Sequence, residues 1–585
     1  MPSSTKGGSF LLEPTASTDI FVPEDLSFEL RELGTTTAKF SSREVFSKAE
    51  KIDVKEPGLM PSLLKAAGAQ GLLMVEIPEV YGGLGLGKVA STVIAENITH
   101  QTSFSVAFMC HTGIGTLPVL YYGSEDQKKR YLPKLATGEM LAAYALTEAN
   151  AGTDALAGKA KAVLSPDKKH YLLNGEKVFI TNGGIADLIT IFAKVDGEHF
   201  TAFLVEKGFE GVSTGKEEDK MGLHGTSTVP IYLNDAKVPV ENVLGEIGKG
   251  HKIAFNVLNI GRWKLGAACV GAMKRVIELM APYANQRYQF GKPISSFQLI
   301  RQKIARSAIL TYLTESLVYR YAGALDEALS KIERDSPDCA KCSVDAIEEL
   351  AIEASIAKVF GSEALWWMAD EGVQTFGGYG FIRDYPVEHH LRDCRINRIF
   401  EGTNEINRLI ITGTLIKRAM AGRLDLMMRL QEILAQLKAG FPEADAAQPL
   451  GIWVDQVERL KRLVIYVAGV AIQKYTTALE SHQATLALIS DIIMDTYALE
   501  SGLIRALKVK KPQHEAAAIA AIAERAPVLA ARARQALVNI AEGNEQTMAP
   551  YLKAFERIVK FAPADVDALL ETVAARVLEK EAYGD

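Results

Sequence analysis

Cysteine is scarce in this sequence, and its distribution argues against two classes of protein. Five cysteines in 585 residues do not provide the paired spacings of a disulfide framework. Cys339 and Cys342 form one Cys-x-x-Cys in a charged segment, without the second pair or histidine cluster of a typical zinc site. We interpret them as part of a surface insertion, with a zinc or redox role as the alternative, and expect no metal site.

Long hydrophobic runs and targeting signals are missing as well. The longest uninterrupted apolar run of the C-terminal part covers residues 463–472, half of the roughly 20 residues that a membrane-spanning helix needs. The first residues show neither the pattern of a secretory signal nor that of a transit peptide. We therefore expect a cytoplasmic protein that does not span a bilayer. The acidic junction at residues 439–446 predicts membrane attachment that is at most peripheral, at the inner face.

No large excess of charge of one sign is present. The net charge is −6 and the isoelectric point about 6.0, which gives no general attraction to nucleic acid or anionic lipid. A phosphate-rich ligand would therefore need a local site. Apolar residues are abundant, at 48% of the chain, and a globular chain of 585 residues divides into two to four structural units.

The pattern of apolar residues changes twice along the chain. Apolar residues three and four apart predict helices before residue 142 and after residue 250, whereas short β-favouring runs lie between them. Asn174-Gly175 and Asp196-Gly197 predict turns of a compact antiparallel barrel or sandwich, so the fold class is mainly α with a central β domain. The predicted units are an N-terminal extension (1–24), an N-terminal helical domain (25–142), a β-barrel domain (143–250), a catalytic helical bundle (251–424), a linker (425–449) and an additional C-terminal helical domain (450–585).

The glycine-rich run Tyr81-Gly-Gly-Leu-Gly-Leu-Gly87 is similar to a dinucleotide-binding turn, but the pattern is incomplete. Lys88 stands where the last glycine of Gly-x-Gly-x-x-Gly would have to follow Gly83 and Gly85. We therefore predict a plain loop at this position.

One carboxylate has surroundings suited to proton abstraction. In Arg398-Ile-Phe-Glu-Gly-Thr-Asn-Glu-Ile406, Glu401 precedes Gly402 and a predicted helix that Thr403 or Asn404 can cap. The glycine lets the backbone approach a ligand closely, and helix-start N–H groups favour a diphosphate. An apolar ligand would desolvate this carboxyl and raise its pKa toward the working pH, as a carbon base requires. A surface salt bridge is the alternative that this segment alone leaves open.

Five blocks of sequence resemble the acyl-CoA dehydrogenase family in order and in spacing. They are Pro78-Glu-Val-Tyr-Gly-Gly-Leu-Gly85, Tyr144-Ala-Leu-Thr-Glu-Ala-Asn-Ala-Gly-Thr-Asp154, Lys177-Val-Phe-Ile-Thr-Asn-Gly-Gly184, Arg287-Tyr-Gln-Phe-Gly-Lys292 with Phe297-Gln298, and Gln374-Thr-Phe-Gly-Gly-Tyr-Gly-Phe381 followed by Arg392-Asp393 and Ile399-Phe-Glu-Gly-Thr-Asn404. The resemblance covers about residues 25–420, and the helical tail is similar to that of the very-long-chain branch. It implies an N-terminal helical domain, an antiparallel β-barrel and a helical bundle, plus an additional C-terminal helical domain.

The resemblance implies FAD as the cofactor of a homodimer. Thr147 and Thr181 would bind the polar edge of the flavin, while Leu146 and Phe179 pack against its ring. Arg287, whose fork of donors suits a diphosphate, would reach the FAD of the neighbouring subunit. The cofactor-binding residues implied in this way are Tyr144, Leu146, Thr147, Phe179, Thr181, Arg287, Gln289, Phe290, Gln298, Gln374, Gly377, Gly378, Thr403 and Glu405.

The resemblance also implies how an acyl-CoA substrate is held. Thr153 matches the residue at the thioester and coenzyme A end, and Asn259 and Arg262 match positions that face the adenine end. Gly402, next to the catalytic acid, completes the implied substrate-binding set. Ala149 replaces the proline that is usual in the flavin loop, so we expect intact FAD binding with a more mobile loop.

Three small residues favour a long acyl chain. Val106, Ala107 and Cys110 stand where shorter-chain members of the family carry bulkier or polar side chains. Smaller side chains leave a deeper slot, and each buried methylene group contributes about 0.8 kcal/mol.

Taken together, the matches imply α,β-dehydrogenation of a long acyl-CoA to trans-2-enoyl-CoA in fatty acid β-oxidation. Glu401 would take the pro-R α-proton while a β-hydride moves to flavin N5. The Glu401 N–H and a ribityl hydroxyl would polarise the thioester carbonyl, and an electron-transferring flavoprotein would accept the electrons. Two alternatives stay open: an acyl-CoA oxidase that uses oxygen, and a non-catalytic assembly or scaffold protein on the same fold.

Overall fold

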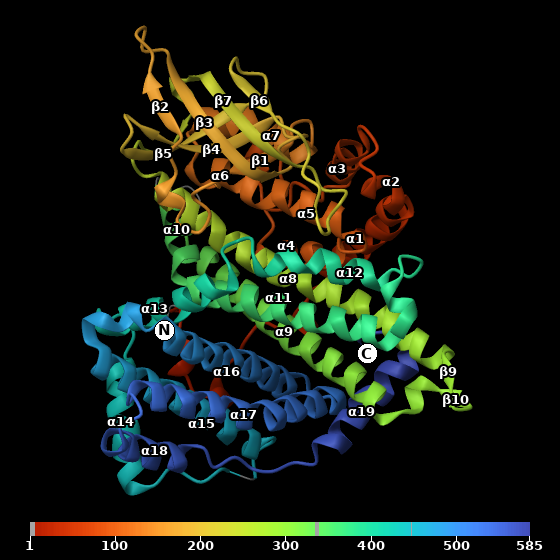
Figure 1. The fold of residues 1–585 in the computed structure, drawn as a ribbon, viewed down its shortest axis with the longest axis vertical. Coiled ribbons are helices and arrows are strands. Elements are labelled where there is room, and N and C mark those ends of the chain that lie inside the picture. Colours follow the sequence, from red (N-terminus) through yellow and green to blue (C-terminus); the bar gives the residue numbers. More distant parts are fainter. Residues whose placement is uncertain (1–5, 334–337, 446, 585) are drawn as a thin grey trace.

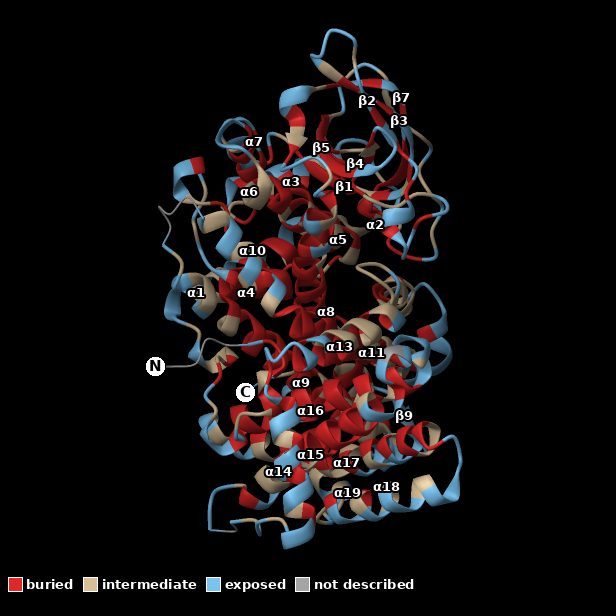
Figure 2. Cartoon of the chain, turned by 90° about the vertical axis from the view of Figure 1, so that its left-hand side faces the viewer, coloured by how far each residue is buried: buried red, intermediate tan, exposed pale blue. Residues whose placement is uncertain are grey.

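One β layer and several helical layers are stacked along the long axis of the molecule. The structure, a computed structural model, describes residues 6–333, 338–445 and 447–584. Figure 1 shows the β domain at one end, the C-terminal helices at the other, and the long helices of the bundle between them. Buried residues gather where these layers meet, along α8 (Gly250–Gln286), α9 (Gln298–Ser330) and α16 (Gln483–Val509) (Figure 2). This confirms the predicted fold class.

Side-chain caps mark the start of helices in the N-terminal helical layer. Ser27 accepts a hydrogen bond from the Leu30 N–H, and Ser124 and Gln127 form a capping box. The glycine-rich run before Lys88 is a loop, as predicted. The helices are α1 (Phe28–Phe40), α2 (Ala49–Asp53), α3 (Leu59–Ala69), α4 (Lys88–Asn97), α5 (Thr102–Cys110), α6 (Leu117–Tyr122) and α7 (Glu125–Thr137).

One segment of this layer is long and apolar enough to cross a membrane by length and composition. It covers Thr102–Tyr122 and consists of α5, a π-helical turn (His111–Gly115) and α6. Within the described fold, 72% of its most apolar window is buried. It forms part of the core between the N-terminal helices and the β domain.

The central β domain is a mixed sheet in which most neighbouring strands are antiparallel. The hydrogen-bonded order is β6-β7-β3-β2-β4-β5-β8, with β1 beside β4. The strands are β1 (Ala142–Ala145), β2 (Lys161–Leu164), β3 (His170–Thr181), β4 (Leu188–Val195), β5 (His199–Glu206), β6 (Val212–Thr214), β7 (Thr228–Pro239) and β8 (Val243–Leu244).

Two details of the predicted barrel are wrong. β4 runs parallel to both β1 and β2, because β3 folds back along one side of β2 and the chain then returns on the other side. A strand thus replaces the crossover helix that parallel pairing usually needs. Asn174-Gly175 is no turn but a bulge within β3, with Gly175 at φ 148°. Asp196-Gly197 does form the β4–β5 turn, and both residues have positive φ.

The bundle is held together by close helix crossings. At the crossing of α8 and α11 (Ala351–Phe376), a Cβ on Gly266 would lie 2.9 Å from the Ala357 carbonyl oxygen. A Cβ on Gly361 would in turn lie 3.4 Å from the Gly266 Cα. Glycine on both helices therefore permits this close contact. The bundle also contains α10 (Cys339–Glu349), α12 (Val387–Cys394) and α13 (Asn404–Met420), and the hairpin of β9 (Tyr288–Gln289) and β10 (Lys292–Pro293) projects beyond α8.

The predicted linker 425–449 is wrong over most of its length. Leu426–Ala439 form helix α14, whose Leu430, Ile433 and Leu437 are buried. Leu430 packs against Gly469 of α15 (Gly451–Tyr475). Gly440 and Pro442 follow directly after this helix and stop it. The loop to α15 begins only there.

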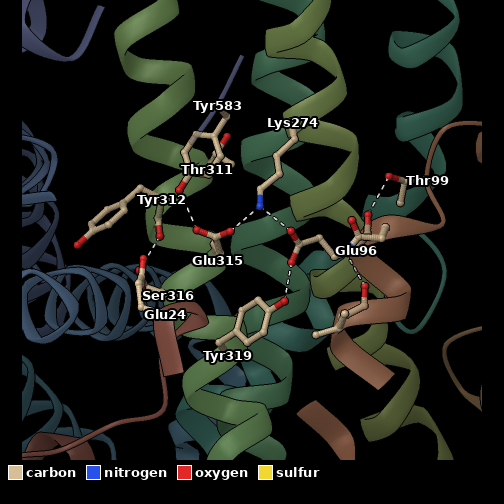
Figure 3. Close-up of polar contacts among 12 residues, drawn as sticks. Glu24, Glu96, Thr99, Lys274, Thr311, Tyr312, Glu315, Ser316, Tyr319 and Tyr583 are labelled. Carbon is tan, nitrogen blue, oxygen red and sulfur yellow. Dashed lines mark hydrogen bonds and ion pairs between the residues drawn. The ribbon is translucent and has the colours of Figure 1, made fainter. Parts of the chain in front are cut away.

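The N-terminal extension and the C-terminal helices are joined by buried polar contacts. Thr15 donates two hydrogen bonds to Glu458, and the Phe10 ring lies 4.8 Å from that of Tyr497. At the opposite chain end, Tyr583 donates to Glu315 (Figure 3). The C-terminal domain comprises α15, α16, α17 (Pro512–Ile540), α18 (Glu545–Ile558) and α19 (Val566–Lys580).

A chain of charged side chains continues from Glu315 to the N-terminal layer. Lys274 of α8 lies 2.5 Å from both Glu315 of α9 and Glu96 of α4, and Tyr319 donates to Glu96 at 2.8 Å (Figure 3). Arg505 of α16 pairs with the other oxygen of Glu315 at 2.6 Å. Each buried charge is thereby compensated across a domain boundary, which the sequence pattern alone does not indicate.

Candidate active site

Glu401 stands in a strained turn of the bundle, directly before α13. Its φ is 58° and that of Gly402 is 81°, both in the left-handed region that costs a non-glycine residue energy. Thr403 caps α13 by accepting a hydrogen bond from the Ile406 N–H, so of the two predicted caps it is Thr403 that acts. Asn407 donates its amide N–H groups to the carbonyls of Gly402 and Thr403, at 2.8 and 3.0 Å. The turn is thus fixed by the first turn of the helix that follows it.

The Glu401 carboxylate faces α8. A Cβ on Gly261 would lie only 2.4 Å from Glu401 Oε2, so this glycine leaves the space that the carboxylate occupies. Oε2 is buried and has no hydrogen-bond partner among the described residues. Burial raises the pKa of Glu401 to about 7, against the opposing charges of Arg262 and Lys358. A carboxyl in this state can accept a proton near neutral pH.

The turn is held by two buried cations. Arg262 Nε donates to the Glu401 carbonyl at 3.2 Å, and its NH1 donates to Asn259 Oδ1 at 2.7 Å. Asn259 and Arg262, which the resemblance assigned to the coenzyme A end, are therefore bound to each other beneath the turn, with 5% of each exposed. Lys358 of α11 donates to the Gly402 carbonyl at 2.8 Å. The sequence analysis missed Lys358 and Gly261; a lone lysine in the apolar run 351–360 was the available signal.

The β domain contributes a second group of predicted residues. Phe179 lies at the irregular pairing of β3 with φ 59°, and its ring is 65% exposed. The Val178 N–H donates to the Thr147 carbonyl, which places the loop after β1 beside this irregularity. Such a bulge directs an aromatic face outward, where a planar ligand can stack. Leu146, Thr147 and Thr181 are half-buried nearby, and Tyr144 is buried.

One residue links this group to Glu401. The Cys110 thiol donates to the Thr181 carbonyl over 3.6 Å. Burial, and after it the charge of Glu401, raises the pKa of both the Cys110 thiol and the Tyr144 hydroxyl. Both groups therefore lie within electrostatic reach of the carboxylate. The predicted flavin loop, the end of β3 and the predicted base thus meet at one place.

A third group of predicted residues lines a pocket at another part of the bundle. Arg287, Gln289, Gly377 and Gly378 line a pocket of about 560 Å³, where the Arg287 guanidinium lies 5.3 Å from the centre of the Tyr379 ring. A Cβ on Gly378 would meet no atom within 4 Å, so the pocket is open at this glycine. The other predicted members of this group, Phe290, Gln298 and Gln374, are exposed.

The structure does not bring all the predicted residues together in one chain. The hairpin β9–β10, which carries Gln289, lies at the far end of the bundle from the β domain (Figure 1). Glu405 is exposed in the first turn of α13, and Thr153 is exposed in the flavin loop. The predicted cofactor set is therefore divided between two separate surfaces.

A small cavity of about 20 Å³, room for a single water molecule, lies between α4, α5 and α8. Phe108, Met109 and Thr112 line it, together with Ile94 and Leu117 from the neighbouring helices. Val106, Ala107 and Cys110, the small residues predicted beside the acyl chain, do not line this cavity, and a long slot beside them stays a prediction. Cys110 faces Thr181, and the Ala107 carbonyl accepts a hydrogen bond from Asn182.

The cavity wall also contains buried charges that the sequence analysis did not anticipate. Glu76 lies 2.5 Å from Lys264 Nζ and is in contact with Lys88 as well. Burial alone would raise the pKa of Glu76, but the attraction of the two lysines outweighs it and lowers the pKa to about 2. The carboxylate is therefore ionised across the physiological range and the cavity has a polar wall.

Cys339 and Cys342 lie in the first turn of α10. Cys342 is exposed and Cys339 half-buried at the start of α10. Across the described ranges of the chain, no group of three or more His, Cys, Asp or Glu residues is placed to hold a metal ion.

Comparison with known sequences defines the class of protein. Family models described as acyl-CoA dehydrogenase domains match four successive parts of the chain: the N-terminal domain at residues 27–139, the middle domain at 143–236, and two C-terminal domains at 248–416 and 459–554. A probable acyl-CoA dehydrogenase of Bacillus subtilis is 44% identical over 99% of this chain and 98% of its own length. The chain therefore belongs to the acyl-CoA dehydrogenase family, as the sequence blocks indicated.

Other relatives place the chain more closely within that family. The human mitochondrial very long-chain specific acyl-CoA dehydrogenase is 39% identical over 65% of this chain, a region that spans 55% of the human protein. A crystal structure of an acyl-CoA dehydrogenase complexed with FAD from Bacillus anthracis matches with a TM-score of 0.97 and 44% identity, covering 99% of this chain and 100% of that one. Butyryl-CoA dehydrogenase from Megasphaera elsdenii matches with a TM-score of 0.60 and 33% identity, over 67% of this chain and 99% of its own. The last match leaves out a third of this chain.

Proposed function

We propose that this protein catalyses the FAD-dependent α,β-dehydrogenation of fatty acyl-CoA thioesters, with Glu401 as the base. The observation that carries the proposal is a buried carboxyl oxygen of Glu401 without a partner, facing the space beside Gly261. Its pKa of about 7 makes it a competent base at neutral pH, since desolvation destabilises the charged form. A surface salt bridge, the alternative interpretation of this segment, does not fit a carboxylate so placed.

The chain's own residues prepare the site for proton transfer. The Glu401 carboxylate accepts the α-proton, and by family resemblance the Glu401 backbone N–H donates to the thioester oxygen. Arg262 and Asn407 hold carbonyls of the same turn, so the base and this donor keep a fixed relation. One preorganised donor of this kind is worth about 3 kcal/mol in the transition state.

The residues present fit FAD. The exposed ring of Phe179 suits the apolar face of a flavin, and Thr147 and Thr181 lie beside it. The open pocket with Arg287, Gly377 and Gly378 suits a diphosphate and an adenosine, because glycine permits close approach and arginine offers paired donors. FAD bound at these residues supplies a two-electron acceptor for the β-hydride.

The division of these residues between two surfaces supports a homodimer. Phe290 on the β9–β10 hairpin is 93% exposed and Phe381 is 86% exposed, an unusual state for two aromatic side chains near a ligand pocket. A second copy of the chain would cover them and bring the Arg287 group to the partner's flavin site. Gel filtration at micromolar concentration should give the mass of a dimer.

We propose a long, unbranched acyl chain and an electron-transferring flavoprotein as the electron acceptor. The support for a long chain is the small size of Val106, Ala107 and Cys110, which by family resemblance leaves a deeper slot for the acyl chain. An anaerobic titration with acyl-CoAs of four to eighteen carbons tests the first point, because tighter binding with length is expected until the slot for the acyl chain is full. Hydrogen peroxide release in air at the full turnover rate would instead indicate an oxidase.

Glu401→Gln tests the central claim. The variant should retain bound FAD but lose the anaerobic bleaching of the flavin by acyl-CoA. Glu443→Gln, which changes an exposed carboxylate outside the predicted site, is the control and should bleach normally. Rapid bleaching in Glu401→Gln would remove this residue from its role, and purified protein that cannot bind FAD would favour a scaffold.

A further inference from the structure

A second buried cation, Lys358, contacts the turn that carries the base. Lys358 lies on α11 in an apolar stretch and is 0% exposed. Its ammonium donates to the Gly402 carbonyl at 2.8 Å and to Asn404 Oδ1 at 2.6 Å. Both acceptors are neutral, and they belong to the residue directly after Glu401 and to the first residue of α13.

This arrangement is a costly way to fill a helix interface. A buried ammonium loses its hydration, and a methionine of similar length would pack against α8 without that loss. Burial indeed lowers the pKa of Lys358 to about 7, while the charge of Glu401 opposes the change. Because Lys358 binds the strained turn itself, the contact restricts where the Glu401 carboxylate can lie.

The geometry of this contact has two effects on Glu401. The hydrogen bond to the Gly402 carbonyl ties the turn to α11, which is fixed against α8 by the Gly266–Gly361 crossing. A cation on α11 also favours the ionised form of the nearby carboxylate. The other charged or titratable groups that act on Lys358 are Arg262 and Cys269 of α8 and Glu363 of α11.

We infer that Lys358 is a positioning residue for the dehydrogenation: it clamps the Glu401–Gly402 turn so that the carboxylate faces the substrate α-carbon, and its charge favours the ionised form of that carboxylate. The inference rests on the proposed role of Glu401. It predicts that Lys358 contributes to the chemical step and not to the binding of FAD or acyl-CoA, because both of its hydrogen bonds go to the turn and to the start of α13.

The test compares Lys358→Met with Lys358→Arg. Lys358→Met should bind FAD and acyl-CoA as the wild type does, yet its single-turnover rate of flavin bleaching should fall about 10²-fold, as expected for a misplacement of about 1 Å. Without the neighbouring cation, the acid limb of its pH–rate profile should move to higher pH. Lys358→Arg keeps the charge, so its acid limb should stay near that of the wild type while the rate recovers only in part.

A matched control separates positioning from general loss of stability. Lys461, at 2% exposure in the C-terminal domain, is another buried lysine, and Lys461→Met should lower the melting temperature without moving the pH–rate profile. A wild-type rate and an unmoved acid limb in Lys358→Met would overturn the inference. If Lys358→Met does not fold, the test rests on Lys358→Arg, which keeps the charge. An acid limb that moves to higher pH in Lys358→Arg, as expected only for a lost charge, would then overturn the inference. Normal bleaching in Glu401→Gln would instead refute the proposed function itself.

Discussion

Gly261 provides a sharp test of how closely the base is fitted to its surroundings. A Cβ at this position would lie 2.4 Å from Glu401 Oε2, which is 1.0 Å shorter than the 3.4 Å at which ordinary contact begins. In Gly261→Ala the carboxylate must therefore move by about 1 Å, and a shift of that size costs about 10²-fold in rate. Alanine is the better helix former by about 1 kcal/mol, so α8 itself should not be weakened.

The assay is anaerobic mixing of the FAD-loaded enzyme with saturating acyl-CoA, followed by the loss of flavin absorbance. FAD content and melting temperature are measured on the same samples, and both should match the wild type. Gly413→Ala is the control, because this glycine of α13 has no atom within 4 Å of an added Cβ. Its bleaching rate should be unchanged. A wild-type rate in Gly261→Ala would show that the carboxylate does not react from the position seen in this structure.

Three further predictions follow from the buried charges. Because Glu401 must be ionised to accept a proton and its pKa is about 7, kcat/KM should rise about tenfold per pH unit below pH 7 and level off above it; a flat profile from pH 5.5 to 8.5 would contradict this. The pKa of Glu76 is lowered to about 2, so its stabilisation is complete above its ordinary pKa and is lost as the pH falls toward 2. Glu76→Gln should thus lower the free energy of unfolding by roughly 3–5 kcal/mol at pH 7 in urea titrations, and the difference should narrow at pH 3. Tyr583→Phe removes one donor from Glu315 and should cost about 1 kcal/mol, with faster proteolysis of α19 as the readout; unchanged proteolysis would argue against a role in docking the tail.

Several helices and turns could be predicted from the sequence, because the interactions that form them act between residues close together in the chain. The apolar spacing predicted helices after residue 250, where α8 begins, and Asp196-Gly197 predicted a turn that requires positive φ. The same kind of reasoning failed at Asn174-Gly175, because a bulge and a turn use the same residues and differ only in the partner strand. It failed again at α14, where a linker was predicted over residues 425–449 although Leu430, Ile433 and Leu437 are apolar, three or four residues apart, and buried.

The candidate site likewise has features set by neighbouring residues in the sequence and features set by tertiary contacts. The sequence by itself determined that Glu401 precedes a glycine and a helix start, because capping and turn preferences act between neighbours in the chain. Only the tertiary structure decided that Gly261 makes room for the carboxylate, that Lys358 holds the turn, and that Glu76 is ionised against Lys264. These contacts join residues far apart in sequence, and their energies depend on burial, which exists only once the helices have packed.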